Sequence, residues 1–404
     1  MTVGLSLIAL AGVAAASAQA LPEMRATVEV VSDAVKARTI HGWHSSRLVM
    51  HDGALYAAAT AADPDGANDW QDRGLLYRRD PGGSWSVVGE TPNQPYHMCV
   101  GADGHFWVVA PARYHTAEVF RSKTPGRLDD LELMYNGTCA YLGASVNDAG
   151  DFLLLHARDG TSLPNAVVAK FYEAATGVWH TSEFPTPEGR CGYEGIMLRG
   201  KSAFAIVNSS ANPPPDGATA QESSPWRTVR LARCDDLTKG EWVTRAWLDQ
   251  PYGATGLADM YVDGEVTYLT YSHRGANSLD TYGDTPGGNY IARIRQDMSV
   301  EAFEFAVGVG GGRIVRDSTG RFAFVGRAGD EHHVWDLDVA RDFALINERR
   351  LVGTAGKLTN YVVHTLRPQR FGGETDGDTV HLLSTTVTDD PDNETLNHVS
   401  FPLR

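Results

Sequence analysis

The sequence predicts an all-β protein, a seven-bladed β-propeller with four-stranded antiparallel blades. Two observations lead to this fold class. A strand, a tight turn and a second apolar strand recur seven times, and the composition, with 42 glycines and nine tryptophans in 404 residues, is typical of many short strands joined by turns. A repeat of roughly 45 to 65 residues has the length expected of a propeller blade.

The turn between the first two strands marks each repeat. A glycine in this turn supplies the positive φ that a two-residue hairpin loop needs. A β-sandwich does not repeat one hairpin unit in this way, and the period is too long for a β-helix, so the propeller is favoured. In chain order the seven turns are Asp52-Gly53, Asp103-Gly104, Ala149-Gly150, Gly200-Lys201, Asp263-Gly264, Thr319-Gly320 and Asp376-Gly377.

An outer pair of strands is expected after each hairpin. Residues 74–88, 167–184 and 229–248 show it most clearly, because each contains a Gly-x-Trp turn before its last strand. Closure of the ring also has candidate strands. Residues 26–31 alternate in polarity and are predicted to pair with residues 398–403, which would join the two ends of the chain and remove an open sheet edge.

The first 20 residues are predicted to be a signal peptide. Residues 3–16 are mostly apolar and small, and the run Ala-Ser-Ala-Gln-Ala that ends at Ala20 offers small-x-small cleavage sites. The alternative is a buried N-terminal helix, since the segment is too short to span a bilayer. We therefore expect a single propeller domain over residues 21–404, secreted or periplasmic.

Charge restricts the binding partners. The net charge is −15, and the chain contains no basic run of the kind that nucleic acid requires. No second apolar segment is long enough for membrane insertion. We expect a monomer whose partner is an anionic polysaccharide or oligosaccharide, drawn in by a local cationic site because the field of the whole molecule is negative.

Imidazole, phenol and guanidinium groups recur at one level of the predicted ring. Counting back from each turn to the start of the first strand gives His44, His97, Tyr141, Tyr193, Leu257 with Asp259 close by, and His364. Counting forward to the end of the second strand gives Arg158, Asn208, His273 and Arg327. The predicted catalytic set is His97, Tyr141 and Arg158, and the predicted substrate-binding set is His44, His273, Tyr193 and Arg327.

These residue types suit β-elimination at a uronic acid. An arginine neutralises the sugar carboxylate and makes the C5 proton more acidic, one of the His and Tyr side chains removes that proton, and the other protonates the departing O4. A guanidinium is apt because it grips a carboxylate with two parallel hydrogen bonds and keeps its charge. No carboxylate pair at the strand ends supports glycoside hydrolysis by two acids.

The motifs PYHMC around His97, CAYLGASV around Tyr141 and LLLHARDG around Arg158 are similar to those of the secreted seven-bladed propeller polysaccharide lyases, of the ulvan lyase and rhamnose-glucuronic acid lyase type. The resemblance implies acid/base roles for His97 and Tyr141 and carboxylate neutralisation by Arg158. A second His of these lyases is replaced here by Tyr77, so His44 or His115 would have to substitute.

Two other activities remain open. The related propeller α-L-rhamnosidases, which remove rhamnose linked to glucuronic acid, use a single inner His of the first blade, and His44 in HGWHSSR matches that position. A non-catalytic glycan-binding propeller is the other alternative, because a fold does not imply a function. The Asp-box of propeller sialidases is not found intact in the sequence.

We expect no cofactor for the chemistry. The resemblance allows a structural calcium or zinc ion, whose ligands the sequence does not assign. The four cysteines, Cys99, Cys139, Cys191 and Cys234, predict one or two disulfides in an oxidising compartment.

Overall fold

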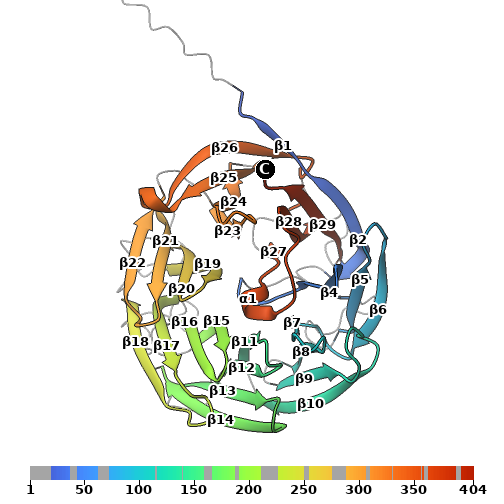
Figure 1. Ribbon diagram of the computed structural model, residues 1–404, viewed down its shortest axis with the longest axis vertical. Coiled ribbons are helices and arrows are strands. Elements are labelled where there is room, and N and C mark those ends of the chain that lie inside the picture. Colours follow the sequence, from blue (N-terminus) through green and yellow to red (C-terminus); the bar gives the residue numbers. More distant parts are fainter. Residues whose placement is uncertain are drawn as a thin grey trace, which may run out of the picture.

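Seven small β-sheets surround a common axis in the computed structural model (Figure 1). The sheets are antiparallel apart from one added edge strand, so the predicted all-β, seven-bladed propeller is confirmed. The structure describes residues 20–36, 43–61, 72–113, 116–138, 140–158, 166–186, 191–210, 226–249, 254–274, 288–305, 310–329, 331–355, 357–358, 363–387 and 393–404.

The first four blades each use four strands that follow one another in the chain. Blade 1 contains β3 (Leu48–His51), β4 (Ala54–Thr60), β5 (Gly74–Arg79) and β6 (Trp85–Thr91). Blade 2 contains β7 (His97–Val100), β8 (Phe106–Arg113), β9 (Thr116–Ser122) and β10 (Leu131–Thr138). Blade 3 contains β11 (Ala140–Val146), β12 (Phe152–Ala157), β13 (Ala166–Glu173) and β14 (Val178–Pro185). Blade 4 contains β15 (Cys191–Arg199), β16 (Ser202–Ser210), β17 (Trp226–Cys234) and β18 (Trp242–Asp249).

Blade 5 is also built from four consecutive strands, whereas blades 6 and 7 include the chain ends. Blade 5 contains β19 (Ala254–Asp263), β20 (Val266–Arg274), β21 (Gly288–Arg295) and β22 (Val300–Glu304). Blade 6 contains β23 (Gly310–Arg316), β24 (Phe322–Ala328), β25 (Glu331–Asp338) and β26 (Ala344–Val352), with the 3-10 helix η1 (Val339–Arg341) before β26 and with β1 (Glu23–Arg25) at its edge. Blade 7 contains β27 (His364–Thr365), β28 (Thr379–Val387), β29 (Asn393–Pro402) and β2 (Thr27–Lys36).

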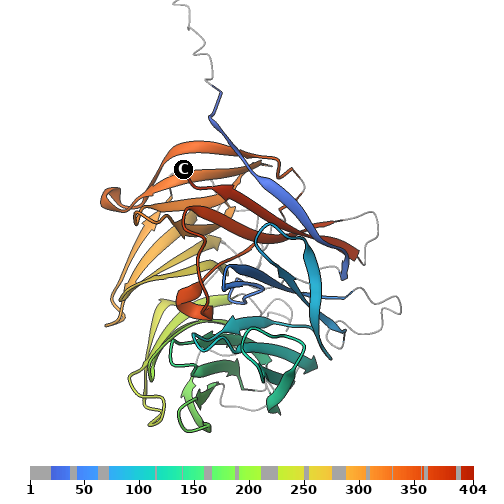
Figure 2. The ribbon, with the colours of Figure 1, turned by 45° about the vertical axis from the view of Figure 1, so that its right-hand side comes forward.

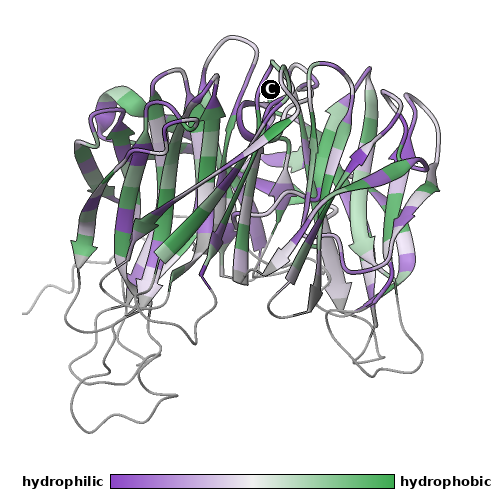
Figure 3. Ribbon diagram, turned by 90° about the horizontal axis from the view of Figure 1, so that it is seen from below, coloured by the Kyte–Doolittle hydropathy of each residue, from purple (hydrophilic) through white to green (hydrophobic). Residues whose placement is uncertain are grey.

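The hairpin turns that mark the blades lie where the sequence places them. The glycine of each turn adopts a positive φ, which only glycine reaches without a steric penalty. The values are 71° at Gly53, 77° at Gly104, 80° at Gly150, 51° at Gly200, 54° at Gly264, 89° at Gly320 and 51° at Gly377. The strands that these turns join run across the thickness of the ring, as the side view in Figure 3 shows.

The ring closes through the N-terminal strand, as predicted. β2 pairs antiparallel with β29, with Thr27 opposite Ser400 and Val28 opposite Val399. β1 then crosses to the neighbouring sheet and pairs parallel with β26, which the sequence did not predict (Figure 2). Blade 6 therefore has five strands instead of four, and the N-terminal segment fastens two blades together.

Aromatic rings fill the space between adjacent blades. The Trp107 ring of blade 2 stacks on Phe152 of blade 3, with centroids 4.5 Å apart and planes 12° apart. Both side chains are completely buried. Large buried rings of this kind dominate the apolar surface removed from water when the blades pack together.

The seventh blade departs from the pattern. Its inner strand β27 has only two residues, and the chain then forms the short helix α1 (Pro368–Phe371) on the axis of the ring (Figure 1). The Ser145 hydroxyl donates a 2.6 Å hydrogen bond to the Arg370 carbonyl, and Gly372 forms a parallel bridge with Val100. A Cβ at Gly372 would lie 1.7 Å from the Val100 carbonyl oxygen, so glycine is required for this close approach. The segment after β27 thus crosses the bore and attaches to blades 2 and 3.

Other sequence predictions are only partly covered by the described residues. Residues 1–19 of the predicted signal peptide lie outside them, as do Cys139 and His115. Cys99 and Cys234 are buried free thiols, so neither forms a disulfide. The helices in the described ranges have three and four residues, and neither is long and apolar enough to cross a membrane.

Candidate functional site

One end of the inner strands carries the predicted site residues. His97 begins β7, Tyr141 is the second residue of β11, and His364 begins β27. The ends of the second strands lie at the same level, because Thr255 pairs with His273 and Gly192 with Asn208. The alignment on the turns therefore placed these residues on one face of the ring, the face opposite the seven hairpin turns.

His97 is fixed inside the wall between blades 2 and 3. Its side chain is completely buried, and its Nε2–H donates a 2.9 Å hydrogen bond to the Leu142 carbonyl of β11. Because a carbonyl only accepts, Nε2 carries the proton and Nδ1 holds a lone pair, which has no hydrogen-bond partner among the described residues. Burial, against the raising effect of the Leu142 hydrogen bond, lowers the pKa of His97 to about 3, so the ring is neutral at physiological pH.

Tyr141 occupies an irregular position in the inner strand of blade 3. Its φ is +47°, a left-handed conformation that is rare for a tyrosine. The pairing of β11 with β12 shifts register between Ala140 and Leu142, so Tyr141 is the bulged residue. The side chain is partly exposed. A strained backbone that aims one side chain out of a regular strand is characteristic of functional positions.

Arg158 lies directly after the second strand of the same blade. Its backbone N–H donates a 2.8 Å hydrogen bond to the Ala166 carbonyl, and its guanidinium forms an ion pair with Glu183 of the outer strand β14. About 30% of the Arg158 side chain and 53% of the Glu183 side chain are exposed. Ala157, the residue before Arg158, pairs with Ala140, the residue before Tyr141, so the two predicted groups lie at the same end of one hairpin.

The predicted substrate-binding residues are distributed around the ring. The His44 ring lies 5.9 Å from the His97 ring and 5.5 Å from the Tyr96 ring, and its side chain is completely buried. Tyr193 lies in β15, where the pairing with β16 shifts register between Gly192 and Gly195; its side chain lies outside the described set. The structure thus brings His44 and His97 together in the wall of the bore.

His273 and Arg327, the other two predicted substrate-binding residues, belong to blades 5 and 6. His273 Nδ1 lies 3.4 Å from the Thr255 hydroxyl, and burial lowers the pKa of His273. Arg327 is opposite Gly310 at the start of β23. Both side chains are partly exposed, so both remain accessible from the face that carries Tyr141 and Arg158.

Sequence reasoning missed the charged side chains deeper in the bore. Arg47, Arg313, Arg367 and Arg370 are buried there, together with the carboxylates Asp259 and Glu194. The alignment on the turns named Asp259 only as a neighbour of Leu257. The cations were not found, because an arginine in an apolar strand is ordinarily a surface residue and the segment that carries Arg367 and Arg370 breaks the repeat.

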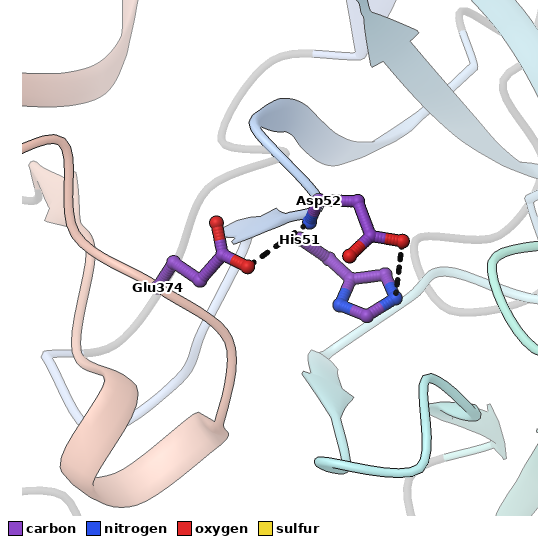
Figure 4. Close-up of side chains that lie close together, drawn as sticks. All are labelled: His51, Asp52 and Glu374. Carbon is purple, nitrogen blue, oxygen red and sulfur yellow. Dashed lines mark hydrogen bonds and ion pairs between the residues drawn. The ribbon is translucent and has the colours of Figure 1, made fainter.

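One group of metal-ligating side chains comes together in the described ranges, at the opposite end of the inner strands. His51, Asp52 and Glu374 place one ligand atom each within 4.8 Å of the others (Figure 4). The Glu374 carboxylate accepts hydrogen bonds of 3.3 Å from the backbone N–H groups of Asp52 and Gly53. These bonds explain the position of Glu374 as a cap on the first hairpin turn, so we assign no metal to this group.

Chemically, the site offers a partly exposed phenol, a partly exposed guanidinium and a buried neutral imidazole that holds the phenol's strand. Such a set can bind an anionic group and transfer a proton close to it.

No protein-family model and no curated protein sequence matches the chain. Among solved structures, it is similar to a PL25 ulvan lyase bound to a GlcA(1-4)Rha3S oligosaccharide, with a TM-score of 0.61 and 9% identity over 93% of this chain and 96% of that chain. The polysaccharide lyase Uly1 gives a TM-score of 0.61 and 11% identity over 94% of this chain and 99% of that chain.

A different enzyme has a related architecture. Hydrazine synthase from Kuenenia stuttgartiensis gives a TM-score of 0.53 and 12% identity over 86% of this chain and 94% of that chain. At identities this low, the likenesses show a shared propeller fold.

Proposed function

We propose that the protein is a secreted or periplasmic polysaccharide lyase that cleaves a uronic-acid-containing glycan, of the ulvan or rhamnosyl-glucuronic acid type, by β-elimination. The observation that carries the proposal is the strained, bulged position of Tyr141 at the same hairpin end as Arg158. The likeness in fold to ulvan lyase structures supports the class of substrate.

In the proposed reaction Arg158 binds the carboxylate of the uronic acid. Its positive charge stabilises the negative charge that develops when the C5 proton is removed. The Tyr141 hydroxyl gives its own proton to O4 while its oxygen accepts the C5 proton. A double bond forms between C4 and C5, the C4–O4 bond breaks with its electron pair on O4, and the hydroxyl is restored, so no oxidant or reductant is required.

His97 receives a positioning role in this proposal. The sequence predicted an acid/base role, but the side chain is completely buried and its pKa of about 3 makes it a weak base. Its hydrogen bond to Leu142 instead fixes the peptide that follows Tyr141. His273, Tyr193 and Arg327, on the same face, are proposed to bind neighbouring sugar units.

The direct test follows the ultraviolet absorbance of the unsaturated uronate product on incubation with ulvan and other uronate glycans. Tyr141→Phe should reduce kcat by at least about 100-fold, the usual contribution of a proton-transfer group. Arg158→Ala should raise KM and lower kcat. Tyr172→Phe, a buried tyrosine on β13 of the same blade, is the matched control and should retain activity.

Two other outcomes would overturn the lyase assignment. Release of free rhamnose without ultraviolet absorbance would identify an α-L-rhamnosidase; His44, proposed for that chemistry, is completely buried, which disfavours it. Binding of uronate glycans without turnover would identify a glycan-binding propeller. Full activity of the Arg158 variant would contradict the carboxylate-binding role.

The ion pair between Arg158 and Glu183 makes a separate prediction. Glu183 competes with the substrate carboxylate for the guanidinium, so Glu183→Gln should lower KM. The pair is partly exposed, and such pairs are worth at most about 1 kcal/mol, which corresponds to a decrease of about five-fold or less. Asp129→Asn removes the same charge from an exposed pair with Arg127 and should leave KM unchanged.

A further inference from the structure

A cavity of about 130 Å³ lies between blades 5 and 6, at the end of the inner strands that carries the proposed site. Its wall on blade 5 includes Gly256, Ser272 and Asn289, which lie opposite one another on β19, β20 and β21. Gly256 is exposed, and Ser272 and Asn289 are partly exposed. The cavity therefore opens to solvent on the face of the ring that carries Tyr141 and Arg158.

Small residues leave this space open. The junction between blades 2 and 3 is filled by the stacked rings of Trp107 and Phe152. At the mouth of the cavity, in contrast, Gly256 has no side chain, and a Cβ added there would lie 3.1 Å from the Ser272 hydroxyl oxygen, with no other close contact among the described residues. A larger residue at position 256 would place its side chain beside Ser272, in the mouth of the cavity.

The lining of the cavity is apolar inside and polar at its mouth. Phe305 and Phe324 line it with buried rings whose centroids are 5.1 Å apart. The Thr270 hydroxyl is already used, because it donates a 3.4 Å hydrogen bond to the Gly312 carbonyl. None of the described residues that line the cavity carries a charge. Such a lining suits a neutral ligand that has an apolar end and hydroxyl groups.

The walls of the cavity lead to two residues that we propose to bind sugar units. On blade 5, His273 follows Ser272 at the end of β20. On blade 6, Arg327 of β24 is opposite Gly310, two residues before Gly312 of the cavity wall. A glycan chain that contacts both His273 and Arg327 therefore crosses the mouth of the cavity.

We infer that this cavity is a subsite for the methyl end of a neutral 6-deoxyhexose unit of the glycan, an inference that rests on the proposed function for the identity of the polymer. A methyl group gains free energy when it leaves water for the phenyl rings, whereas the hydroxymethyl group of an ordinary hexose loses its hydration there. The uronate carboxylate is assigned to Arg158 on blade 3, so the uncharged cavity takes a different unit. Complete small-ligand sites measure about 300–1,000 Å³, so this volume fits one end of a sugar.

The test uses saturation-transfer NMR on the unsubstituted protein with two sugars that differ in one group. Methyl α-L-rhamnopyranoside carries a methyl group on C5, where methyl α-L-mannopyranoside carries a hydroxymethyl group. We expect the rhamnoside to bind about five-fold or more tightly, with the strongest saturation on its C5 methyl protons. Equal affinity for the two sugars, or no binding of either, would overturn the inference.

The substitution Gly256→Leu locates the binding site. It should abolish rhamnoside binding, because the leucine side chain occupies the mouth of the cavity. The unfolding midpoint should be retained, since Gly256 is exposed and its backbone lies outside the left-handed region. Gly83→Leu, at an exposed glycine between β5 and β6 on the turn face, is the matched control and should keep the rhamnoside affinity. Unchanged rhamnoside affinity in the Gly256→Leu variant would contradict the subsite.

Lyase activity is followed separately through the ultraviolet absorbance of the unsaturated product. Preferential rhamnoside binding without that product would support the subsite and overturn the lyase assignment. Formation of the product without a preference for the rhamnoside would overturn the subsite and leave the lyase assignment intact. Failure of this inference and failure of the proposed function are therefore distinguishable.

Discussion

At the scale of single residues, the hydrogen bond from His97 to Leu142 connects the wall of blade 2 to the strand that carries Tyr141. His97→Ala removes this donor and leaves the Leu142 carbonyl without its partner, which we expect to reduce kcat about 10-fold or more. His97→Gln retains a side-chain N–H donor and should recover part of the activity, because a positioning residue needs only the donor.

Measurement of kcat and KM for both variants separates positioning from proton transfer. Equal and complete loss in the Ala and Gln variants would show that the imidazole itself transfers a proton, in conflict with the positioning role. A change confined to the unfolding midpoint, with kcat retained in both, would show that His97 is structural only.

The residue types at the start of the inner strands were predictable, because the turns served as an alignment reference. The contacts of each side chain were not predictable. Arg158 is paired with Glu183, a residue 25 positions away on an outer strand, and the positive φ of Tyr141 depends on a register shift that only the folded sheet defines. Arg47 follows the predicted His44 by three residues, yet its burial arises from Tyr96 and the elements around the bore.

At the scale of elements, a chain of side chains fastens the closing strand β2 to the last blade. His381 and His398 lie 2.9 Å apart on β28 and β29, and the His398 Nδ1–H donates a 3.0 Å bond to Glu29 of β2. Arg79 of blade 1 donates a 2.7 Å bond to the other Glu29 oxygen. Glu29 therefore joins β2 to both sides of the ring closure.

Substitution Glu29→Gln should destabilise the ring. A neutral amide weakens two charge-assisted hydrogen bonds at a partly buried site, so we expect the free energy of unfolding to fall by about 1–2 kcal/mol. Urea unfolding measures this change. Glu90→Gln, in the exposed pair with Arg73, should cost less than about 0.5 kcal/mol, and an equal effect of both substitutions would contradict the role of Glu29 in closure.

Elements that repeat were predicted, and elements that break the repeat were not. The hairpin glycines and the pairing of β2 with β29 follow from local turn chemistry and alternating polarity. β1 was not predicted because three residues carry too little pattern to indicate parallel pairing with β26. α1 was not predicted because its four residues are held by contacts with strands more than 150 positions away, such as the Arg370 bond to Ile196.

At the scale of the whole molecule, buried neutral imidazoles make the fold sensitive to acid. Burial lowers the pKa of His97 to about 3 and the pKa values of His156 and His398 to about 4, against an unfolded value of 6.5. At a pH between these folded-state pKa values and 6.5, the unfolded chain binds more protons than the folded protein does. Stability is therefore complete above about pH 6.5 and is lost as the pH falls toward 4, by up to about 1.4 kcal/mol per pH unit for each imidazole.

Urea unfolding at pH 7.5, 6 and 5 tests this dependence. The free energy of unfolding should be lowest at pH 5, and His156→Gln, which removes one titrating group in blade 3, should give a shallower slope. His51→Gln, a partly exposed histidine on the turn face, should keep the slope of the unsubstituted protein. The same stability at pH 5 and 7.5 would contradict this dependence and show that these imidazoles are protonated in the folded state.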